Sequence, residues 1–225
     1  MRPQHLGLIP DGNRRWAREH GLEVWQGHER GVRVLEDFLH WCLEEDIPEV
    51  TVYTLSLENL ERRPAEELRH LYRLMNSCLR RLEGDRTLHE KEVRVRVVGR
   101  LNRLPDFLLS GVRKIVEATR PYSRRYVNFL IAYSAQDELF SALRRLLSSR
   151  PARLTREMLE RHLWVKRPVD LVIRTGRERR LSNFLLYQAA YAELFFVDKY
   201  WPDFTREDLE RCLEEFEERQ RRMGS

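Results

Sequence analysis

The 225-residue sequence contains no long hydrophobic run, only three cysteines and few lysines. No stretch of about 18 apolar residues occurs, so we expect no transmembrane helix. A strand begins by residue 5, which leaves no room for a signal peptide. Cys42, Cys78 and Cys212 lie far apart and lack the spacing of metal ligands, so we expect buried, reduced thiols. Together these absences predict a soluble protein of the cytoplasm.

The sequence also lacks internal repeats, low-complexity tracts and linkers rich in proline, glycine or serine. A chain of this length is sufficient for one substantial α/β domain, and two small domains are the less favoured alternative. We therefore expect a single domain over residues 1–225.

Lysine is scarce: only four of the 41 basic residues are lysine, and the other 37 are arginine. Arginine is the better residue for planar, bidentate contacts with phosphate or carboxylate. Because 36 acidic residues are interleaved with the basic ones, often at helical spacing as in residues 207–222, salt-bridged helix surfaces explain much of this arginine. No basic stripe interleaved with aromatic residues occurs, so we expect no nucleic-acid partner.

Short apolar segments alternate with amphipathic ones along the chain. Strands are predicted over residues 6–9, 50–55, 93–98, 126–133, 171–173 and 194–197. Helices are predicted from residue 14 onward and over residues 31–44, 64–82, 105–118, 137–147, 155–163, 183–191 and 205–222. Six apolar strands separated by helices predict an α/β fold with a mainly parallel six-stranded sheet surrounded by helices.

Polar residues follow three of the predicted strands, at the turn after residue 9, at residues 56–59 and at residues 174–176. Ligands of parallel sheets collect beyond the carboxyl ends of the strands. We therefore expect these three segments to converge on one site.

The first of these segments carries Asp11, Gly12 and Asn13. Gly12 lets the backbone approach a ligand closely, and the Asn13 side chain is predicted to cap the following helix. The free N–H groups of that helix, together with Arg14 and Arg15, favour an anion. A carboxylate in such surroundings indicates a bridging Mg²⁺, which prefers one or two carboxylates with phosphate oxygens and waters. An ordinary Asp-Gly turn beside surface arginines is the open alternative.

The second informative segment runs from residue 168 to residue 204. Arg174, Arg180 and Ser182 lie between a predicted strand and a predicted helix, where forked and hydroxyl donors suit a diphosphate. Each charge-assisted hydrogen bond of this kind contributes roughly 1.5–3 kcal/mol. Glu193 is either a second carboxylate for the metal or an ion-pair partner, and the residues alone favour the ion pair.

These segments resemble the cis-prenyltransferase family, the undecaprenyl diphosphate synthase-like isoprenyl transferases. The resemblance runs nearly from end to end, through HLGLIPDGNRRWA, the Gly27-His28 pair, SLEN, VRVRVVG followed by LP, DLVIRTG and RLSNFLL, YAEL, WPDF and the C-terminal RMG. It implies a parallel sheet surrounded by helices, with a hydrophobic tunnel between the sheet and the helices at residues 31–44 and 64–82.

The resemblance also implies the activity. Enzymes of this family condense isopentenyl diphosphate with an allylic prenyl diphosphate and form a Z double bond. They require Mg²⁺ and are usually homodimers, and the lipid product implies contact with a membrane surface.

Residue roles carry over by position. Asp11 and Glu193 are the metal-side carboxylates, and Asp11, Asn59 and His28 are the candidates for catalysis, with the base left unassigned. The allylic diphosphate is expected to bind at Gly12, Asn13, Arg14 and Arg15, and Trp16 is expected to contact a substrate. Isopentenyl diphosphate is expected to bind at Arg174, Arg180 and Ser182, with Arg222 and Gly224 reaching it across the dimer. His28, Asn59, Arg62 and Glu67 match active-site or mobile-loop positions.

The chemistry agrees with these residue types. Ionisation of an allylic diphosphate creates a carbocation and a departing anion, so catalysis needs cations at the leaving group and a dry apolar pocket. The paired DDxxD motifs of trans-type synthases are absent, which favours an arrangement with one aspartate.

The sequence departs from the family pattern near the allylic site. Val24 replaces a basic residue, Leu60 replaces a tryptophan, one extra residue precedes Pro64, residues 132–136 lose an arginine, and Arg177 replaces a glycine. These changes leave the allylic partner undetermined. They keep two alternatives open: a short-chain or non-head-to-tail coupling enzyme, and a non-catalytic partner subunit of a prenyltransferase, against which Asp11 counts.

Overall fold

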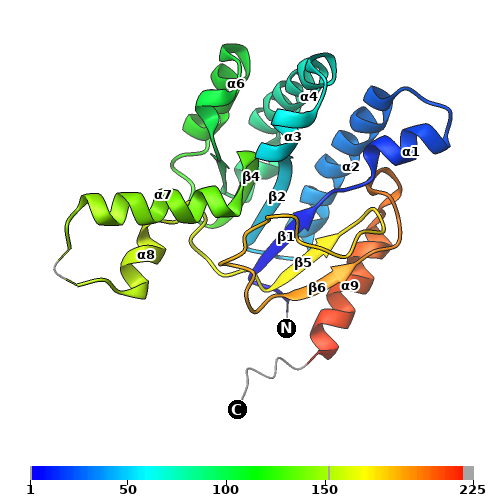
Figure 1. Ribbon diagram of the computed structural model, residues 1–225. Helices are drawn as coiled ribbons and strands as arrows, with labels where there is room; N and C mark the ends of the chain where they lie inside the picture. The colour runs from blue at the N-terminus through cyan, green and yellow to red at the C-terminus, as the bar shows by residue number, and fades with distance from the viewer. Residues whose placement is uncertain (1, 152, 220–225) are drawn as a thin grey trace.

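The computed structural model of the protein describes residues 2–151 and 153–219, and within them six parallel strands form one sheet (Figure 1). The order across the sheet is β3-β4-β2-β1-β5-β6. The strands are β1 (His5–Ile9), β2 (Glu49–Ser56), β3 (Val93–Val98), β4 (Arg125–Tyr133), β5 (Leu171–Arg174) and β6 (Glu193–Phe196). Each lies within one residue of its predicted bounds, so the predicted fold class is confirmed.

The central strand β1 is buried along its whole length. Leu6 and Leu8 belong to the larger core cluster, and Ile9 belongs to a smaller cluster on the other face. Gly7 lies against that smaller cluster, where an added Cβ would come 2.7 Å from Cε1 of Phe184. Successive side chains of a strand point to opposite faces, so an apolar strand of this kind is covered on both sides.

Four helices supply the larger core cluster on one face of the sheet (Figure 1). They are α2 (Val24–Glu44), α4 (Ala65–Glu83), α6 (Asp106–Ala118) and α9 (Arg206–Glu218). In α4 the buried residues Leu71, Met75, Cys78 and Leu82 recur every three or four positions, which makes one side of the helix apolar. The three cysteines are buried and free, as expected.

The smaller cluster covers the other face. Tyr53 of β2, Tyr133 of β4 and Phe184 pack together there. Two helices, α7 (Ala135–Ser148) and α8 (Arg156–His162), project from the sheet beside it (Figure 1). Three short helices, α1 (Asn13–Glu19), α3 (Leu57–Arg62) and α5 (Arg86–Glu90), follow β1, β2 and α4.

Most predicted helices agree with the structure to within two residues. α2 begins at Val24 rather than residue 31, because Glu23 and Gln26 form a capping box. α3 and α5 were not expected, and each begins at a side-chain cap, Ser56 and Asp85 respectively. The predicted end of the last helix, at residue 222, lies outside the described residues.

The helix predicted over residues 183–191 is wrong. This segment forms a series of turns, with positive φ angles of 65° at Asn183 and 33° at Leu185. A right-handed helix cannot contain such residues. Its apolar side chains, Phe184 above all, instead fill the smaller core cluster.

The helices predicted to line a tunnel, α2 and α4, lie side by side over the larger cluster. The tunnel itself stays a prediction. No helix in the described part of the chain is long and apolar enough to cross a membrane.

Candidate active site

A pocket of ≈ 880 Å³ lies where β1, β2 and β5 end, as the polar segments after these strands predict. Eleven residues predicted for the site line it: Asp11, Gly12, Asn13, Arg14, Arg15, His28, Asn59, Arg62, Arg174, Arg180 and Ser182. The convergence of three strand ends is therefore confirmed.

The pocket is strongly cationic. Among the described residues, seven arginines line it, against the two carboxylates Asp11 and Glu58. The arginines are Arg14, Arg15, Arg18, Arg62, Arg63, Arg174 and Arg180. A concave surface lined by charge of one sign concentrates ligands of the opposite sign, so this pocket suits a polyanion.

The turn between β1 and α1 is shaped by Gly12, which is the N-cap of α1 with a φ of 112°. A Cβ at this position would lie 2.6 Å from Cδ1 of Tyr200, so both the backbone angle and the packing require glycine. The prediction that Asn13 caps the helix is wrong. Asn13 is the first helical residue, and its side-chain amide donates to the Pro10 carbonyl at 3.3 Å.

Asp11 lies between two arginines. Its Oδ1 accepts from Nη2 of Arg15 at 3.1 Å, and its Oδ2 accepts from Nη2 of Arg174 at 2.9 Å. The Thr175 hydroxyl joins the same turn, because it accepts from the Asp11 N–H and donates to the Asp11 carbonyl. The ends of β1 and β5 are thus fixed to each other around one carboxylate.

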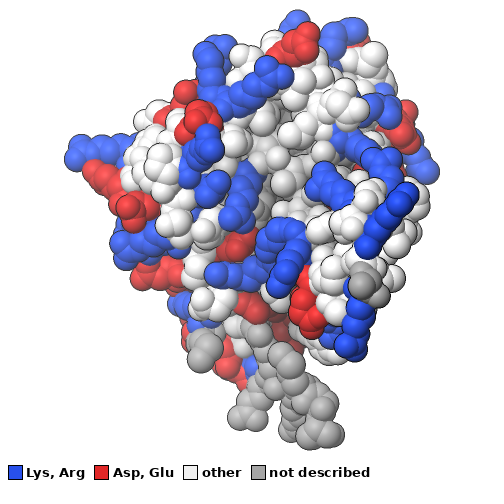
Figure 2. Space-filling view, turned by 90° about the vertical axis from the view of Figure 1, so that its left-hand side faces the viewer, with Lys and Arg blue, Asp and Glu red and all other residues white. Residues whose placement is uncertain are grey.

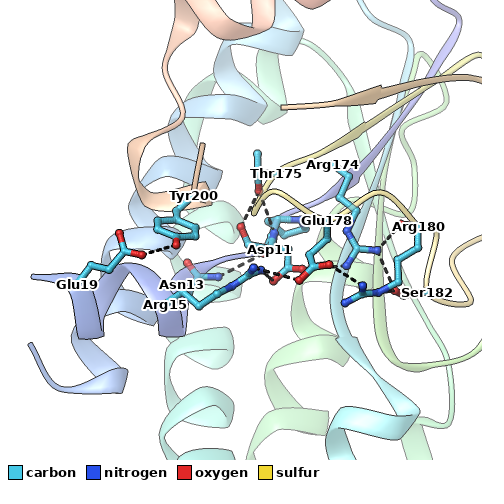
Figure 3. A network of polar contacts seen from close by, with 11 residues as sticks. Asp11, Asn13, Arg15, Glu19, Arg174, Thr175, Glu178, Arg180, Ser182 and Tyr200 are labelled. Carbon is cyan, nitrogen blue, oxygen red and sulfur yellow. Dashed lines mark hydrogen bonds and ion pairs between the residues drawn. The ribbon is translucent and has the colours of Figure 1, made fainter. Parts of the chain in front are cut away.

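These contacts continue into a closed ring of side chains, the Asp11 ring (Figure 3). Arg15 also donates to Glu178 at 3.1 Å, and Glu178 accepts from Arg180 at 2.6 Å. The Ser182 hydroxyl accepts from Arg180 at 3.2 Å and from Arg174 at 2.8 Å. The predicted isopentenyl-binding residues are therefore brought together, and Glu178 is a member of the ring that the sequence analysis missed.

The opposite wall is organised by Glu67 of α4. Its Oε1 lies 3.2 Å from Nε2 of His28, 3.2 Å from Nη1 of Arg63 and 3.7 Å from Nε of Arg14. Glu67 itself does not line the pocket but gathers three side chains that do. One carboxylate therefore positions groups from α1, α2 and the segment before α4.

Burial sets the protonation of this wall. It lowers the pKa of His28, and a neutral imidazole results near pH 7. Because Nε2 faces the Glu67 carboxylate, that nitrogen carries the proton and Nδ1 has the free lone pair. The hydrogen bond from His28 lowers the pKa of Glu67 and exceeds the opposing effect of burial.

Arg63 is the clearest residue that the sequence analysis missed. Its side chain is 17% exposed and pairs with Glu67, whereas the predicted Arg62 lies exposed on the pocket rim. The sequence did contain a sign of this role. The extra residue before Pro64 places a second arginine, Arg63, directly after Arg62. Asn183, directly after Ser182, also lines the pocket.

Two further residues point elsewhere: Trp16, which is carried over from the family, and Arg177, which departs from the family pattern. Trp16 does not line the pocket, because its indole N–H donates to Asp203 at 2.7 Å and its ring stacks on His20. The Arg177 guanidinium lies over the ring of Tyr200 at 4.9 Å, outside the pocket lining. Arg222 and Gly224 lie outside the described residues.

Glu193 is far from Asp11 within this chain. It begins β6 and pairs in register with Leu171, which pairs with Leu6, so it lies at the amino edge of the sheet. Its Oε2 accepts from Nη1 of Arg219 at 2.8 Å. Glu193 therefore forms the ion pair that the residues alone favoured. The register of the strands separates it from Asp11, so these two carboxylates share no metal site within one chain.

The pocket offers few carboxylates to a metal ion such as Mg²⁺. In the described residues no group of three His, Cys, Asp or Glu side chains converges. Asp11 nevertheless offers one carboxylate at the mouth of a cationic pocket, and Mg²⁺ accepts one carboxylate with phosphate oxygens and waters. A metal that arrives together with a diphosphate therefore fits these residues.

The model of the putative undecaprenyl diphosphate synthase family matches residues 9–224. The chain belongs to this family. It is 44% identical to the geranylgeranyl-diphosphate-specific tritrans,polycis-undecaprenyl-diphosphate synthase of Methanopyrus kandleri, over 99% of this chain and 84% of that protein. It is 42% identical to the protein of the same name from Pyrococcus horikoshii, over 99% and 87%.

Two solved structures have a fold similar to that of this chain. A lavandulyl diphosphate synthase from Lavandula x intermedia, in complex with dimethylallyl diphosphate, has a TM-score of 0.92 at 28% identity and 97% coverage of both chains. A probable undecaprenyl diphosphate synthase from Campylobacter jejuni has a TM-score of 0.84 at 31% identity and 100% coverage of both.

The family prediction is thus confirmed, and the protein is a prenyltransferase that condenses isopentenyl diphosphate with an allylic diphosphate. The curated relatives give no support to a short-chain or non-head-to-tail enzyme or to a non-catalytic partner subunit.

Proposed function

We propose that the enzyme extends geranylgeranyl diphosphate with isopentenyl diphosphate to a tritrans,polycis-undecaprenyl diphosphate. The observation that carries this proposal is the composition of the pocket, in which arginines surround Asp11 and Leu71 of α4 lines the same space. Leu71 belongs to the larger core cluster between α2, α4 and the sheet. The arginines match a charged head group, and Leu71 offers apolar surface beside it where an isoprenoid chain would begin. The relatives named above carry the geranylgeranyl specificity in their names.

The Asp11 ring is proposed to take the diphosphates. Arg174, Arg180 and Ser182 would bind isopentenyl diphosphate, while Arg14 and Arg15 would bind the allylic diphosphate. These guanidiniums now hold the carboxylates Asp11, Glu178 and Glu67. Diphosphate oxygens are alternative acceptors for the same donors, so substrate binding replaces ion pairs that the protein already contains.

Mg²⁺ is proposed to bind at Asp11 with the substrate diphosphate. When bound, Mg²⁺ stabilises the negative charge that develops on the leaving diphosphate. Calorimetric titration with Mg²⁺ and a non-hydrolysable allylic diphosphate should give heat that is lost in Asp11→Asn. Equal metal affinity in that variant would contradict the assignment.

Condensation also releases a proton from isopentenyl diphosphate. The neutral His28 keeps Nδ1 as an acceptor, and Asn59 of α3 lines the same pocket. These two residues are retained as candidates for that step.

A homodimer is proposed from the outer face of α7. Phe140, Leu143 and Leu147 are exposed at helical spacing, and Leu154 is exposed in the segment beyond α7. Figure 2 views the side on which α7 and α8 project and shows uncharged surface flanked by arginine and lysine side chains. A two-fold axis brings such a stripe against its own copy, which removes apolar surface from water. Light scattering should give a dimer that Phe140→Glu dissociates.

The function is tested by incubating the purified chain with isopentenyl diphosphate and allylic diphosphates of increasing length, up to geranylgeranyl diphosphate. We expect the highest kcat/KM with geranylgeranyl diphosphate, an undecaprenyl product by mass spectrometry, and loss of activity with chelator. Product formed from two allylic diphosphates without isopentenyl diphosphate would overturn the proposal.

A further inference from the structure

Asn183 lies at a place where the backbone changes direction sharply. Its φ is 65° and that of Ser182 is 49°, so two consecutive residues are left-handed. Phe184, directly after them, is fully buried. The turn therefore points the Ser182 hydroxyl toward Arg174 and Arg180 and leaves the Asn183 amide to face a different wall of the pocket.

The Asn183 amide is bonded on both sides. Nδ2 donates to Oε1 of Glu58 at 2.9 Å and to Oγ of Ser134 at 2.6 Å. Oδ1 accepts from the N–H of Gln136 at 3.1 Å. A carboxylate can only accept and a backbone N–H can only donate, so these partners fix which end of the amide is nitrogen.

Glu58 belongs to α3, a helix without a fully buried side chain. α3 carries Asn59 and Arg62 and leads directly into Arg63, and all three line the pocket. The Asn183–Glu58 bond therefore connects this helix with the loop that holds Ser182. It also restrains a carboxylate that would otherwise be free to pair with an arginine of the pocket.

Resting on the prenyltransferase function above, we propose that Asn183 is a positioning residue that couples the α3 wall to the Ser182 wall. It acts through Glu58 on one side and through its neighbour Ser182 on the other. Both substrates depend on it. The Ser182 wall holds the residues proposed for isopentenyl diphosphate, and α3 leads into Arg63, which pairs with the same Glu67 as Arg14, a residue proposed for the allylic diphosphate.

The test first removes the donor of the Asn183–Glu58 hydrogen bond and then exchanges donor and acceptor between the two residues. Asn183→Asp keeps the shape and a residue that tolerates positive φ, but it places a carboxylate opposite Glu58. We expect the KM for isopentenyl diphosphate and for the allylic diphosphate each to rise about tenfold. Adding Glu58→Gln to the same chain supplies a donor to the new carboxylate at position 183 and should bring both KM values back to within about threefold of the original.

Matched controls separate a hydrogen bond from a change of charge. Asn183→Asp combined with Glu61→Gln has the same net charge, and Glu61 is an exposed residue of the same helix. This pair should not recover either KM. Asn102→Asp, an exposed asparagine far along the chain from the pocket segments, should leave both KM values unchanged.

Equal rescue by Glu61→Gln would overturn the proposal, as would an unrescued double variant or a rise in the isopentenyl KM alone. Thermal unfolding is followed in parallel. If Asn183→Asp does not fold, Asn183→Gly removes the amide and keeps the backbone angle, and the same rise in both KM values is expected. The comparison holds with any allylic substrate that the original enzyme accepts, so it can fail while the proposed specificity stands.

Discussion

Oδ2 of Asp11 lies 2.9 Å from Nη2 of Arg174, a guanidinium whose side chain is only 4% exposed. Asp11 is 32% exposed and faces the pocket, so the pair joins a buried cation to a reachable carboxylate. Arg174 ends β5 and Asp11 follows β1, which makes this contact a direct consequence of two neighbouring parallel strands.

Asp11→Asn should lower activity by about 10²–10³-fold, because a charged group at the reacting diphosphate is lost. It should also destabilise the fold by about 1–3 kcal/mol, since the buried Arg174 keeps only a neutral partner. Steady-state kinetics and urea unfolding measure the two effects. Asp106→Asn, in the exposed first turn of α6, is the matched control, and an equal loss there would contradict this role for Asp11.

Gly12→Ala and Gly21→Ala form a second matched pair. Both positions have positive φ, 112° and 65°, but an added Cβ at Gly21 meets nothing within 4 Å. Gly21→Ala should cost about 1 kcal/mol of backbone strain. Gly12→Ala should cost about 2–4 kcal/mol, because overpacking against Tyr200 adds to the strain. Urea unfolding checks the difference, and equal costs would show that the ring moves aside freely.

Stability should fall as pH drops below 6.5. Burial lowers the pKa of both His5 and His28 below the value of 6.5 for an exposed histidine. The unfolded chain therefore binds protons in a range where the folded chain does not, so the stabilisation is present above pH 6.5 and is lost toward the lower folded pKa values. Unfolding free energies at pH 7.5 and 5.5 measure this.

His5→Asn supplies the control for the pH effect. His5 is fully buried, and its Nε2 lies 2.6 Å from the Thr51 hydroxyl. Asparagine keeps polar atoms there but does not titrate, so the fall between pH 7.5 and 5.5 should be smaller in this variant. An unchanged fall would assign the pH dependence to other groups.

Arg63→Ala should raise the KM of the allylic diphosphate more than Arg62→Ala, by about tenfold against about threefold. Arg63 is held by Glu67 beside His28 and Arg14, whereas Arg62 is exposed. A fixed guanidinium loses less freedom on binding a phosphate than a mobile one. Substrate saturation curves of the two variants decide the order, and a larger effect at Arg62 would refute it.

The sequence predicted the sheet and much of the pocket for a physical reason. Strands that are apolar on both faces must be covered on both faces, which is typical of a parallel sheet. The carboxyl ends of such strands meet at one edge, and this brings Asp11, Arg174 and Ser182 together. Glu193 could not be placed in this way, because its position depends on the register of β6 against β5.

The remaining residues depend on contacts between distant segments. Arg63 becomes part of the site through its ion pair with Glu67, a residue that the family resemblance implied, once α4 packs beside α2. The loop around Asn183 was predicted as a helix, since its apolar pattern does not report the left-handed angles that turn the chain. Local pattern therefore located the pocket and Ser182 but not the left-handed turn that begins there.

Gly7 lets the benzyl ring of Phe184 lie close against the middle strand of the sheet, where a methyl group would have no space. The ring is two residues from the hydroxyl that accepts from Arg174. The position of Ser182 in the pocket wall therefore depends on how Phe184 packs against Gly7 in the core. A methyl group at Gly7 would displace the buried ring of Phe184. Through that ring it would shift Ser182, which lines the pocket.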